Sequence, residues 1–180
     1  MSSPLPEGGR LFFALWPDAA LQRNLYKVGR TVAPPGGKPM AVHNLHITLA
    51  FLGTIGADKR QCMEAQAEAI QLPRFELMLD RTGYWARPQV VWLGCSAVPE
   101  PLQVLAARLN GAMAACGLTP ESRPYSPHLT VLRKARQGPR QLDIDPVHWA
   151  VDDFVLVQSL TLPEGAQYQV VRRWPLAGQL

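Results

Sequence analysis

The alternation of apolar and polar residues divides the chain into short strands and longer helices. Residues 19–32, 57–71 and 99–117 have helix-forming or amphipathic patterns, and Asp18 and Gly117 stand where an N-cap and a C-terminal cap residue belong. Strand patterns occupy residues 10–17, 45–53, 74–86, 89–95, 123–133, 148–159 and 167–176, with a turn at Arg87-Pro88 between the third and the fourth.

The order of these segments repeats in the two halves of the chain. In each half, a helix accompanies a strand that carries His and Thr, and further strands adjoin them. This order predicts a bilobal α+β fold rather than a doubly wound parallel sheet. The length of 180 residues suits a single domain of this kind, spanning residues 1–180.

Two of the predicted strands contain the same unusual pair of polar residues. Residues 43–53 read HNLHITLAFLG and residues 127–133 read PHLTVLR, so the sequence His-x-Thr occurs in both. Because successive side chains of a strand point to opposite faces, His46 and Thr48 share one face, and Ile47, Leu49 and Phe51 share the other.

The second strand follows the same rule. His128 and Thr130 share a face, opposite Leu129 and Val131. Each strand is therefore expected to pack an apolar face on helices and to present an imidazole beside a hydroxyl on the other face. A single histidine of this kind is ordinarily a half-buried residue with a satisfied hydrogen bond, but two copies in one chain favour a functional pair.

Two facing histidines provide an acid and a base for the hydrolysis of a phosphodiester. In-line displacement needs a base on the attacking water and an acid on the leaving oxygen, on opposite sides of phosphorus, and imidazole titrates near neutral pH. The threonine hydroxyls can hydrogen-bond the non-bridging oxygens, on which negative charge grows. A strained 2′,3′-cyclic phosphate suits such a site, because opening the ring releases strain and no metal is then needed.

A metal site is the competing interpretation of the first motif, because His43 and His46 are three residues apart. Positions three apart on a strand point to opposite faces, however, and no carboxylate or cysteine stands at ligand spacing nearby. We therefore expect no metal and no other cofactor.

Composition and charge describe a soluble globular protein. The chain is 47% hydrophobic and 18% charged, and its formal net charge of +4 slightly favours an anionic partner. The nearest approach to a basic cluster is Arg133, Lys134, Arg136 and Arg140. The N-terminal segment does not resemble a signal peptide, and no apolar segment approaches the roughly 20 residues that span a membrane.

The three cysteines, Cys62, Cys95 and Cys116, are an odd number without Cys-x-x-Cys spacing. This argues against a disulfide framework and against a zinc knuckle. We therefore expect a protein of the reducing cytoplasm. No segment resembles an obligate interface, so we expect a monomer.

The segments NLHITLAFLG, VVWLG and RPYSPHLTVLR together resemble the two-histidine phosphoesterase superfamily. Within it, the chain is most similar to the bacterial RNA 2′,3′-cyclic phosphodiesterases, also called 2′-5′ RNA ligases, over nearly its whole length. The resemblance implies two pseudo-twofold-related lobes of antiparallel sheet with flanking helices, each contributing one His-x-Thr strand to a central cleft. It also implies metal-independent hydrolysis of RNA 2′,3′-cyclic phosphate ends to 2′-phosphate ends, with weak, reversible 2′-5′ ligation.

The resemblance also assigns roles to the motif residues. It implies that His46 donates a proton to the departing 3′ oxygen and that His128 accepts a proton from water. It implies that Thr48 and Thr130 hold the phosphate. The two motifs are so alike that their sequences alone do not distinguish the acid from the base.

Three further residues are candidates for contact with the substrate. Arg133 matches an arginine that contacts phosphate, although strict alternation puts it on the wrong face unless the strand bends or bulges after Val131. Of the adjacent Phe12 and Phe13, one faces the core and the other the cleft, where an aromatic ring can stack a terminal base, and we expect Phe13 there. Tyr125 precedes the second motif and is expected to line the cleft.

Two alternative functions stay open. An enzyme of the same superfamily that acts on a small cyclic nucleotide, such as ADP-ribose 1″,2″-cyclic phosphate, would use the same residues. A module that only binds RNA ends would need positive charge rather than two titratable imidazoles, so the presence of His46 and His128 counts against it.

Overall fold

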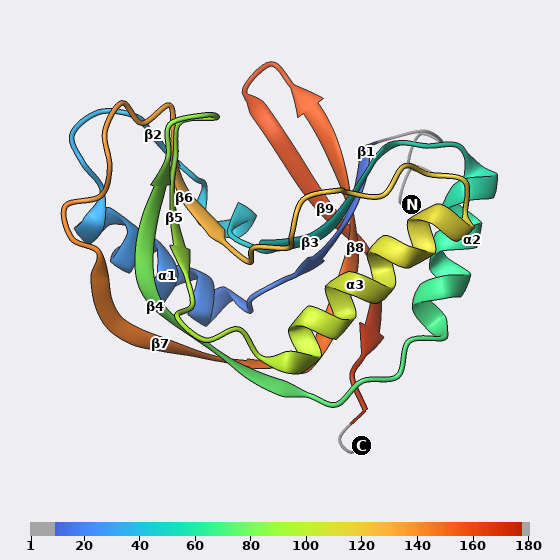
Figure 1. Cartoon of the computed structure of the whole chain (residues 1–180). Coiled ribbons are helices and arrows are strands. Elements are labelled where there is room, and N and C mark those ends of the chain that lie inside the picture. Colours follow the sequence, from blue (N-terminus) through green and yellow to red (C-terminus); the bar gives the residue numbers. More distant parts are fainter. Residues whose placement is uncertain (1–9, 178–180) are drawn as a thin grey trace.

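The computed structural model describes residues 10–177, which form a nine-stranded sheet with three α-helices (Figure 1). In chain order the elements are β1 (Arg10–Leu15), α1 (Ala19–Val32), β2 (Lys38–Pro39), the 3-10 helix η1 (Val42–Asn44), β3 (Ile47–Thr54), α2 (Ala57–Glu68), β4 (Phe75–Trp85), β5 (Val90–Gly94), α3 (Glu100–Ala115), β6 (Leu129–Arg133), β7 (Asp143–Val151), β8 (Asp153–Leu162) and β9 (Gly165–Pro175).

The strands form two four-stranded lobes that meet at the two His-x-Thr strands. The order across the sheet is β7-β4-β5-β6-β3-β1-β8-β9, with β2 paired to β6, and the pairs between these strands are antiparallel. The same unit occurs twice along the chain, as β1, α1 and β3 and as β5, α3 and β6, and the helix of each unit packs on strands of the other lobe. The predicted bilobal α+β fold is confirmed.

The helices cover one face of this sheet and bury the main core. α1 packs on β6 and β7, α3 packs on β3, and α2 packs on α3, so that α1 lies to one side and the other two helices together lie to the other (Figure 1). The expected caps are present: Asp18 Oδ1 accepts the main-chain N–H of Leu21 at 2.8 Å, and Gly117 follows α3 with a φ of 75°.

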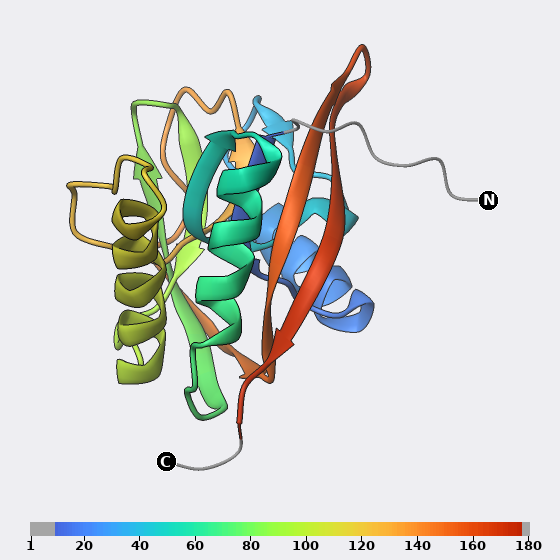
Figure 2. The ribbon, with the colours of Figure 1, turned by 90° about the vertical axis from the view of Figure 1, so that its right-hand side faces the viewer.

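One predicted strand proves to be two. Residues 148–159 divide at Asp152 into the end of β7, at one edge of the sheet, and most of β8, which pairs with β1 in the other lobe. β7 alternates buried and exposed residues, whereas Phe154 to Gln158 in β8 are all buried. Both patterns fit a strand, so the apolar sequence did not mark the crossing between lobes. β8 and β9 then form a long hairpin that extends beyond the other strands (Figure 2).

A disulfide contradicts the expectation drawn from the odd number of cysteines. Cys62 in α2 is bonded to Cys116 at the end of α3, with their Cα atoms 5.8 Å apart, and Cys95 is the free cysteine. The pairing depends on how α2 packs against α3, which a count of cysteines does not reveal. Within residues 10–177, no helix is long and apolar enough to cross a membrane.

Candidate active site

The two motifs meet at a single pair of residues in the middle of the sheet. Ile47 of β3 is opposite Leu129 of β6, and both side chains are fully buried in the core. Their neighbours in each motif, His46, Thr48, His128 and Thr130, therefore project from the other face of the sheet. We call this the histidine face.

The antiparallel register around this pair brings each histidine next to the threonine of the other motif. Extending the register by one residue on either side sets His46 opposite Thr130 and Thr48 opposite His128. Diagonal neighbours in such a ladder are roughly 7–8 Å apart, so the two histidines are close enough for one phosphate group to contact both.

Both histidines are anchored in the same way, although each stands just before the first residue of its strand. Nδ1 of His46 lies 2.7 Å from the main-chain oxygen of Asn44, and Nδ1 of His128 lies 2.9 Å from that of Ser126. A carbonyl oxygen only accepts, so Nδ1 carries the proton in each ring. This leaves Nε2 as the ring nitrogen that can exchange a proton with a bound molecule. In His46 it lies 3.1 Å from the hydroxyl of Thr48.

A bulge directly after each threonine changes which side chains follow it. On β1, Ala14 is opposite Thr48 and the preceding Phe13 is opposite Ala50, so Leu49 is an extra residue in β3. Phe51 is consequently opposite Phe12, on the histidine face, and half of its surface is exposed. The prediction that Phe51 points away from the histidine is therefore wrong.

The second motif has a matching bulge, which is what Arg133 needs to lie on the same face as His128. Trp92 of β5 is opposite Thr130 and the preceding Val91 is opposite Leu132, so Val131 is the extra residue. Leu132 is buried in the core, and the next residue, Arg133, returns to the histidine face. Phe51 and Arg133 thus stand five residues after His46 and His128, in equivalent places.

Aromatic rings surround His46. Trp16 is stacked on its imidazole, with centroids 5.0 Å apart and planes 9° apart, while Phe12 and Tyr168 lie at 5.0 and 5.4 Å. Phe13, the residue expected there, is instead fully buried in the core against Phe154 and Trp174. The prediction that Phe13 rather than Phe12 faces the cleft is therefore wrong. Alternation puts the two rings on opposite faces of the strand, but it does not say which of these faces is the core.

The other lobe and the preceding loop complete the surroundings. Trp85 lies edge-on to His128 with centroids 4.4 Å apart. The hydroxyl of Tyr125 donates to the main-chain oxygen of Thr48 at 2.9 Å, so this residue joins the two motif segments. Asn44, whose side-chain amide donates to Ala166 O at 3.3 Å, holds the β8–β9 hairpin and its Tyr168 beside the site. Sequence reasoning missed these contacts, since they join segments far apart in the chain.

Burial disfavours the charged form of both histidines in the free protein. Burial lowers the pKa of His46 to about 4, opposed by the hydrogen bond to Asn44 O and assisted by the positive charge of His128. Burial likewise lowers the pKa of His128, against the hydrogen bond to Ser126 O. An anion between the rings would favour their charged forms, so a bound phosphodiester raises both pKa values.

The described part of the chain offers little to a metal ion. Residues 10–177 contain no group of three or more His, Cys, Asp or Glu side chains placed to hold one. The donors that converge on the histidine face are imidazole nitrogens and hydroxyls, which suit an oxyanion and its protons.

Comparisons with known proteins agree with this arrangement. A family model described as the 2′-5′ RNA ligase superfamily matches residues 17–161. The chain belongs to this superfamily. It is 37% identical to a member from Escherichia coli (strain K12) named RNA 2′,3′-cyclic phosphodiesterase, over 96% of this chain and 99% of that protein. A similarly named protein of Archaeoglobus fulgidus is 29% identical over 91% of this chain and 98% of that protein.

Solved structures of other proteins share the fold. The crystal structure of E. coli LigT complexed with 3′-AMP has a TM-score of 0.85 at 36% identity and covers 94% of this chain and 99% of that one. The crystal structure of TT0787 of Thermus thermophilus has a TM-score of 0.77 at 27% identity, covering 95% and 100%. The family expected from the two motifs is confirmed.

Proposed function

We propose that this protein is an RNA 2′,3′-cyclic phosphodiesterase that acts as one two-lobed unit and converts cyclic phosphate ends to 2′-phosphate ends without a metal. The arrangement of the two motifs around one cross-strand pair carries the proposal. In this arrangement both Nδ1 atoms are occupied by main-chain oxygens, so the two Nε2 atoms would face the phosphate, with the two threonine hydroxyls beside it. The names of the relatives support the same substrate class.

In the proposed reaction, Nε2 of His128 takes a proton from water as the water oxygen forms a bond to phosphorus. The bond from phosphorus to O3′ breaks, and O3′ takes a proton from Nε2 of His46. The products are a 2′-phosphomonoester and a free 3′ hydroxyl. Attack by an RNA 5′ hydroxyl instead of water would give a 2′-5′ linkage, the weak ligation that the superfamily name implies.

The phosphate would be held from both lobes during this step. Thr48 and Thr130 hydrogen-bond its non-bridging oxygens, and Arg133 offers a guanidinium on the same face to balance the charge that develops there. Because these contacts come from both motifs, the phosphate is oriented in line with the two imidazoles.

The terminal base would stack on Phe51. Its ring is half exposed on the histidine face, lies parallel to Phe12 within 12°, and has the guanidinium of Arg10 at 5.2 Å from its centroid. An exposed aromatic ring beside a cation is typical of sites that bind single-stranded nucleic acid without reading its sequence.

The cytoplasmic location and the monomeric state expected from the sequence stay predictions. The disulfide bears on the first, because disulfides seldom persist in a reducing cytoplasm. Thiol labelling in freshly lysed cells would check the expected location through the redox state of the cysteines. Size-exclusion chromatography of the purified protein would check the monomeric state.

The deciding experiment supplies a short RNA with a 2′,3′-cyclic phosphate end, in EDTA, and identifies the product by mass and by the position of its phosphate. We expect a 2′-phosphate with the wild type and a loss of at least a hundredfold in kcat for both His46→Ala and His128→Ala. The matched control is His43→Ala, which removes an exposed histidine three residues from His46.

Other results would count against the proposal. Activity that EDTA abolishes would contradict the metal-free mechanism. Turnover only of ADP-ribose 1″,2″-cyclic phosphate would support the two-histidine mechanism and show that RNA is not the substrate. RNA binding without turnover of any cyclic phosphate would reduce the protein to a binding module.

A further inference from the structure

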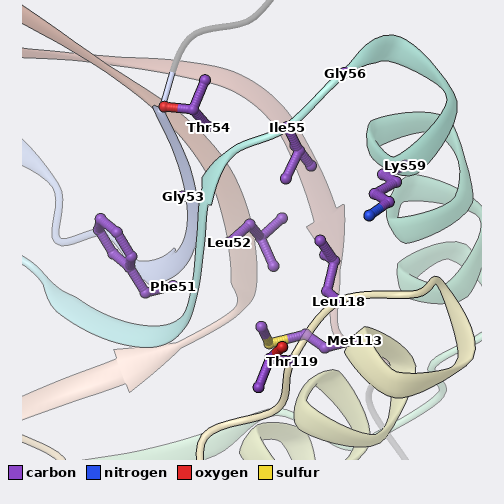
Figure 3. A pocket seen from close by; sticks show the side chains of 10 residues that line it. All are labelled: Phe51, Leu52, Gly53, Thr54, Ile55, Gly56, Lys59, Met113, Leu118 and Thr119. Atoms are coloured by element: carbon purple, nitrogen blue, oxygen red, sulfur yellow. The ribbon is translucent and has the colours of Figure 1, made fainter.

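A pocket lies at the Thr54 end of β3, and Phe51 belongs both to this pocket and to the histidine face. It has a volume of about 470 Å³, within the usual range for ligand sites, and we call it the β3 pocket. Its lining consists of residues 51–56, Lys59, Met113, Leu118 and Thr119. Figure 3 shows Leu52, Leu118 and Met113 pointing toward one another, with Lys59 reaching in from α2 and Phe51 projecting from the other side of the strand.

The pocket lies along an edge of β3 that has no strand partner. β6 pairs with β3 only at Ile47, and no other described strand takes its place beside residues 48–54. Apart from Thr48 O, which accepts from the hydroxyl of Tyr125, the main-chain N–H and C=O groups along this edge have no strand partner and can serve as donors and acceptors. Such groups match the base edges of single-stranded RNA, and the apolar floor of the pocket matches a base face.

The charge of the pocket favours a phosphate. Lys59 is exposed, donates to Gly117 O at 3.1 Å, and keeps two further N–H donors, while the lining contains no carboxylate. The cavity of about 610 Å³ beside Trp16 differs, because three aspartates and one arginine supply its carboxylate and guanidinium groups. Of the two hollows, the β3 pocket is the one that an RNA strand can approach without repulsion.

Phe51 connects the pocket to the histidine face, since its ring stands on that face and its residue lines the pocket. We infer that the β3 pocket is the subsite for the nucleotide 5′ to the terminal one, with its base against the free edge of β3 and the phosphodiester that links it to the terminal nucleotide beside Lys59. This inference rests on the proposed function. It makes the end of an RNA strand, rather than a free cyclic mononucleotide, the preferred substrate.

The test measures binding of product-like RNAs, so it does not depend on turnover. Isothermal titration would compare RNAs of one, two and three nucleotides that carry a 2′-phosphate. We expect the affinity to rise at least tenfold from one to two nucleotides. In Lys59→Gln this gain should fall at least threefold, and the slope of log K against log salt should fall by about 0.7, the value for one phosphate contact on a single strand.

Two further variants make the test specific. Lys27→Gln removes an exposed lysine from α1, outside the pocket, and should keep the full gain with length. Thr119→Trp places an indole from an exposed position in the pocket and should abolish the gain.

Equal affinities for one and two nucleotides, or identical behaviour of Lys59→Gln and Lys27→Gln, would overturn the subsite. Failure of the proposed function would look different. In that case the wild type would not hydrolyse cyclic-phosphate RNA, whereas the dependence of binding on length would still support or refute the pocket.

Discussion

The imidazole of His46 meets two opposed requirements. As the acid of the proposed reaction it must carry a second proton, yet it is packed among Trp16, Phe12 and Tyr168, which replace water and disfavour charge. A substrate anion reconciles these requirements, because its negative charge raises the pKa of the imidazole and so favours the protonated ring. In the proposed reaction, His46 would therefore act as an acid chiefly in the complex with substrate.

The pH dependence should show this coupling. The active form of the pair carries one reactive proton, so kcat/KM, which reports the free protein, should be bell-shaped whichever histidine is the acid. We expect its lower limb near pH 4, from His46, and its upper limb below pH 6.5, because burial lowers the pKa of His128. The profile of kcat should be displaced to higher pH, since bound phosphodiester raises both pKa values. Coincident profiles would contradict the electrostatic argument.

Phe51 and Phe13 should respond to mutation in opposite ways. Phe51 is half exposed on the histidine face, so Phe51→Leu should leave the free energy of unfolding nearly unchanged and weaken RNA-end binding by about 5- to 160-fold, the effect of losing one stacked base. Phe13 is fully buried, so Phe13→Leu should lower the free energy of unfolding by about 1–2 kcal/mol and spare binding in the folded fraction. Urea unfolding and titration with 2′-phosphate RNA would separate the two effects.

At the scale of elements, bulges limit what alternation predicts. A period of two correctly sets His46 and Thr48 on one face, and it fails at Phe51 because Leu49 adds a residue to β3 but not to β1. In the other motif the same kind of bulge was needed to make sense of Arg133, and Val131 provides it. Bulges depend on the partner strand, so the faces beyond each threonine are not encoded in the strand alone.

The disulfide joins α2 and α3 across a sequence separation of 54 residues. Closing a loop of that length stabilises a protein by about 4 kcal/mol on chain-entropy grounds. Cys62→Ser, or reduction of the wild type, should lower the free energy of unfolding by an amount of that order in urea titrations. Cys95→Ser is the matched control, since Cys95 is free, and equal losses in both variants would contradict the assignment.

At the scale of the whole molecule, the sequence predicts the two lobes but not how they are joined. The repeated strand, helix and His-x-Thr strand was readable from residues 10–54 and 90–133. The crossing at Asp152, the disulfide and the contact of Tyr125 with Thr48 were not, because each depends on packing between segments distant in sequence.

Tyr125 tests the coupling between the lobes. Its hydroxyl links the second motif segment to β3, whereas the hydroxyl of Tyr84 donates to Ala135 O at 2.8 Å within one lobe. Tyr125→Phe and Tyr84→Phe should each cost about 1 kcal/mol of unfolding free energy. Only Tyr125→Phe should also lower kcat, by roughly tenfold or less, because it loosens the relation between the two motifs. Equal kcat values in the two variants would show that this link is structural alone.

The pairing of Ile47 with Leu129 gives the site a mechanical property. β3 and β6 share only this residue pair, whereas the neighbouring pairs within each lobe share several. A sheet flexes most easily where the fewest hydrogen bonds cross it, and here that joint lies directly beneath the reaction centre. Spreading or closing the lobes at this joint would therefore change the separation of the imidazoles. A phosphate that binds residues of both motifs would hold the two lobes at one separation. Substrate binding would then also stiffen the protein as a whole.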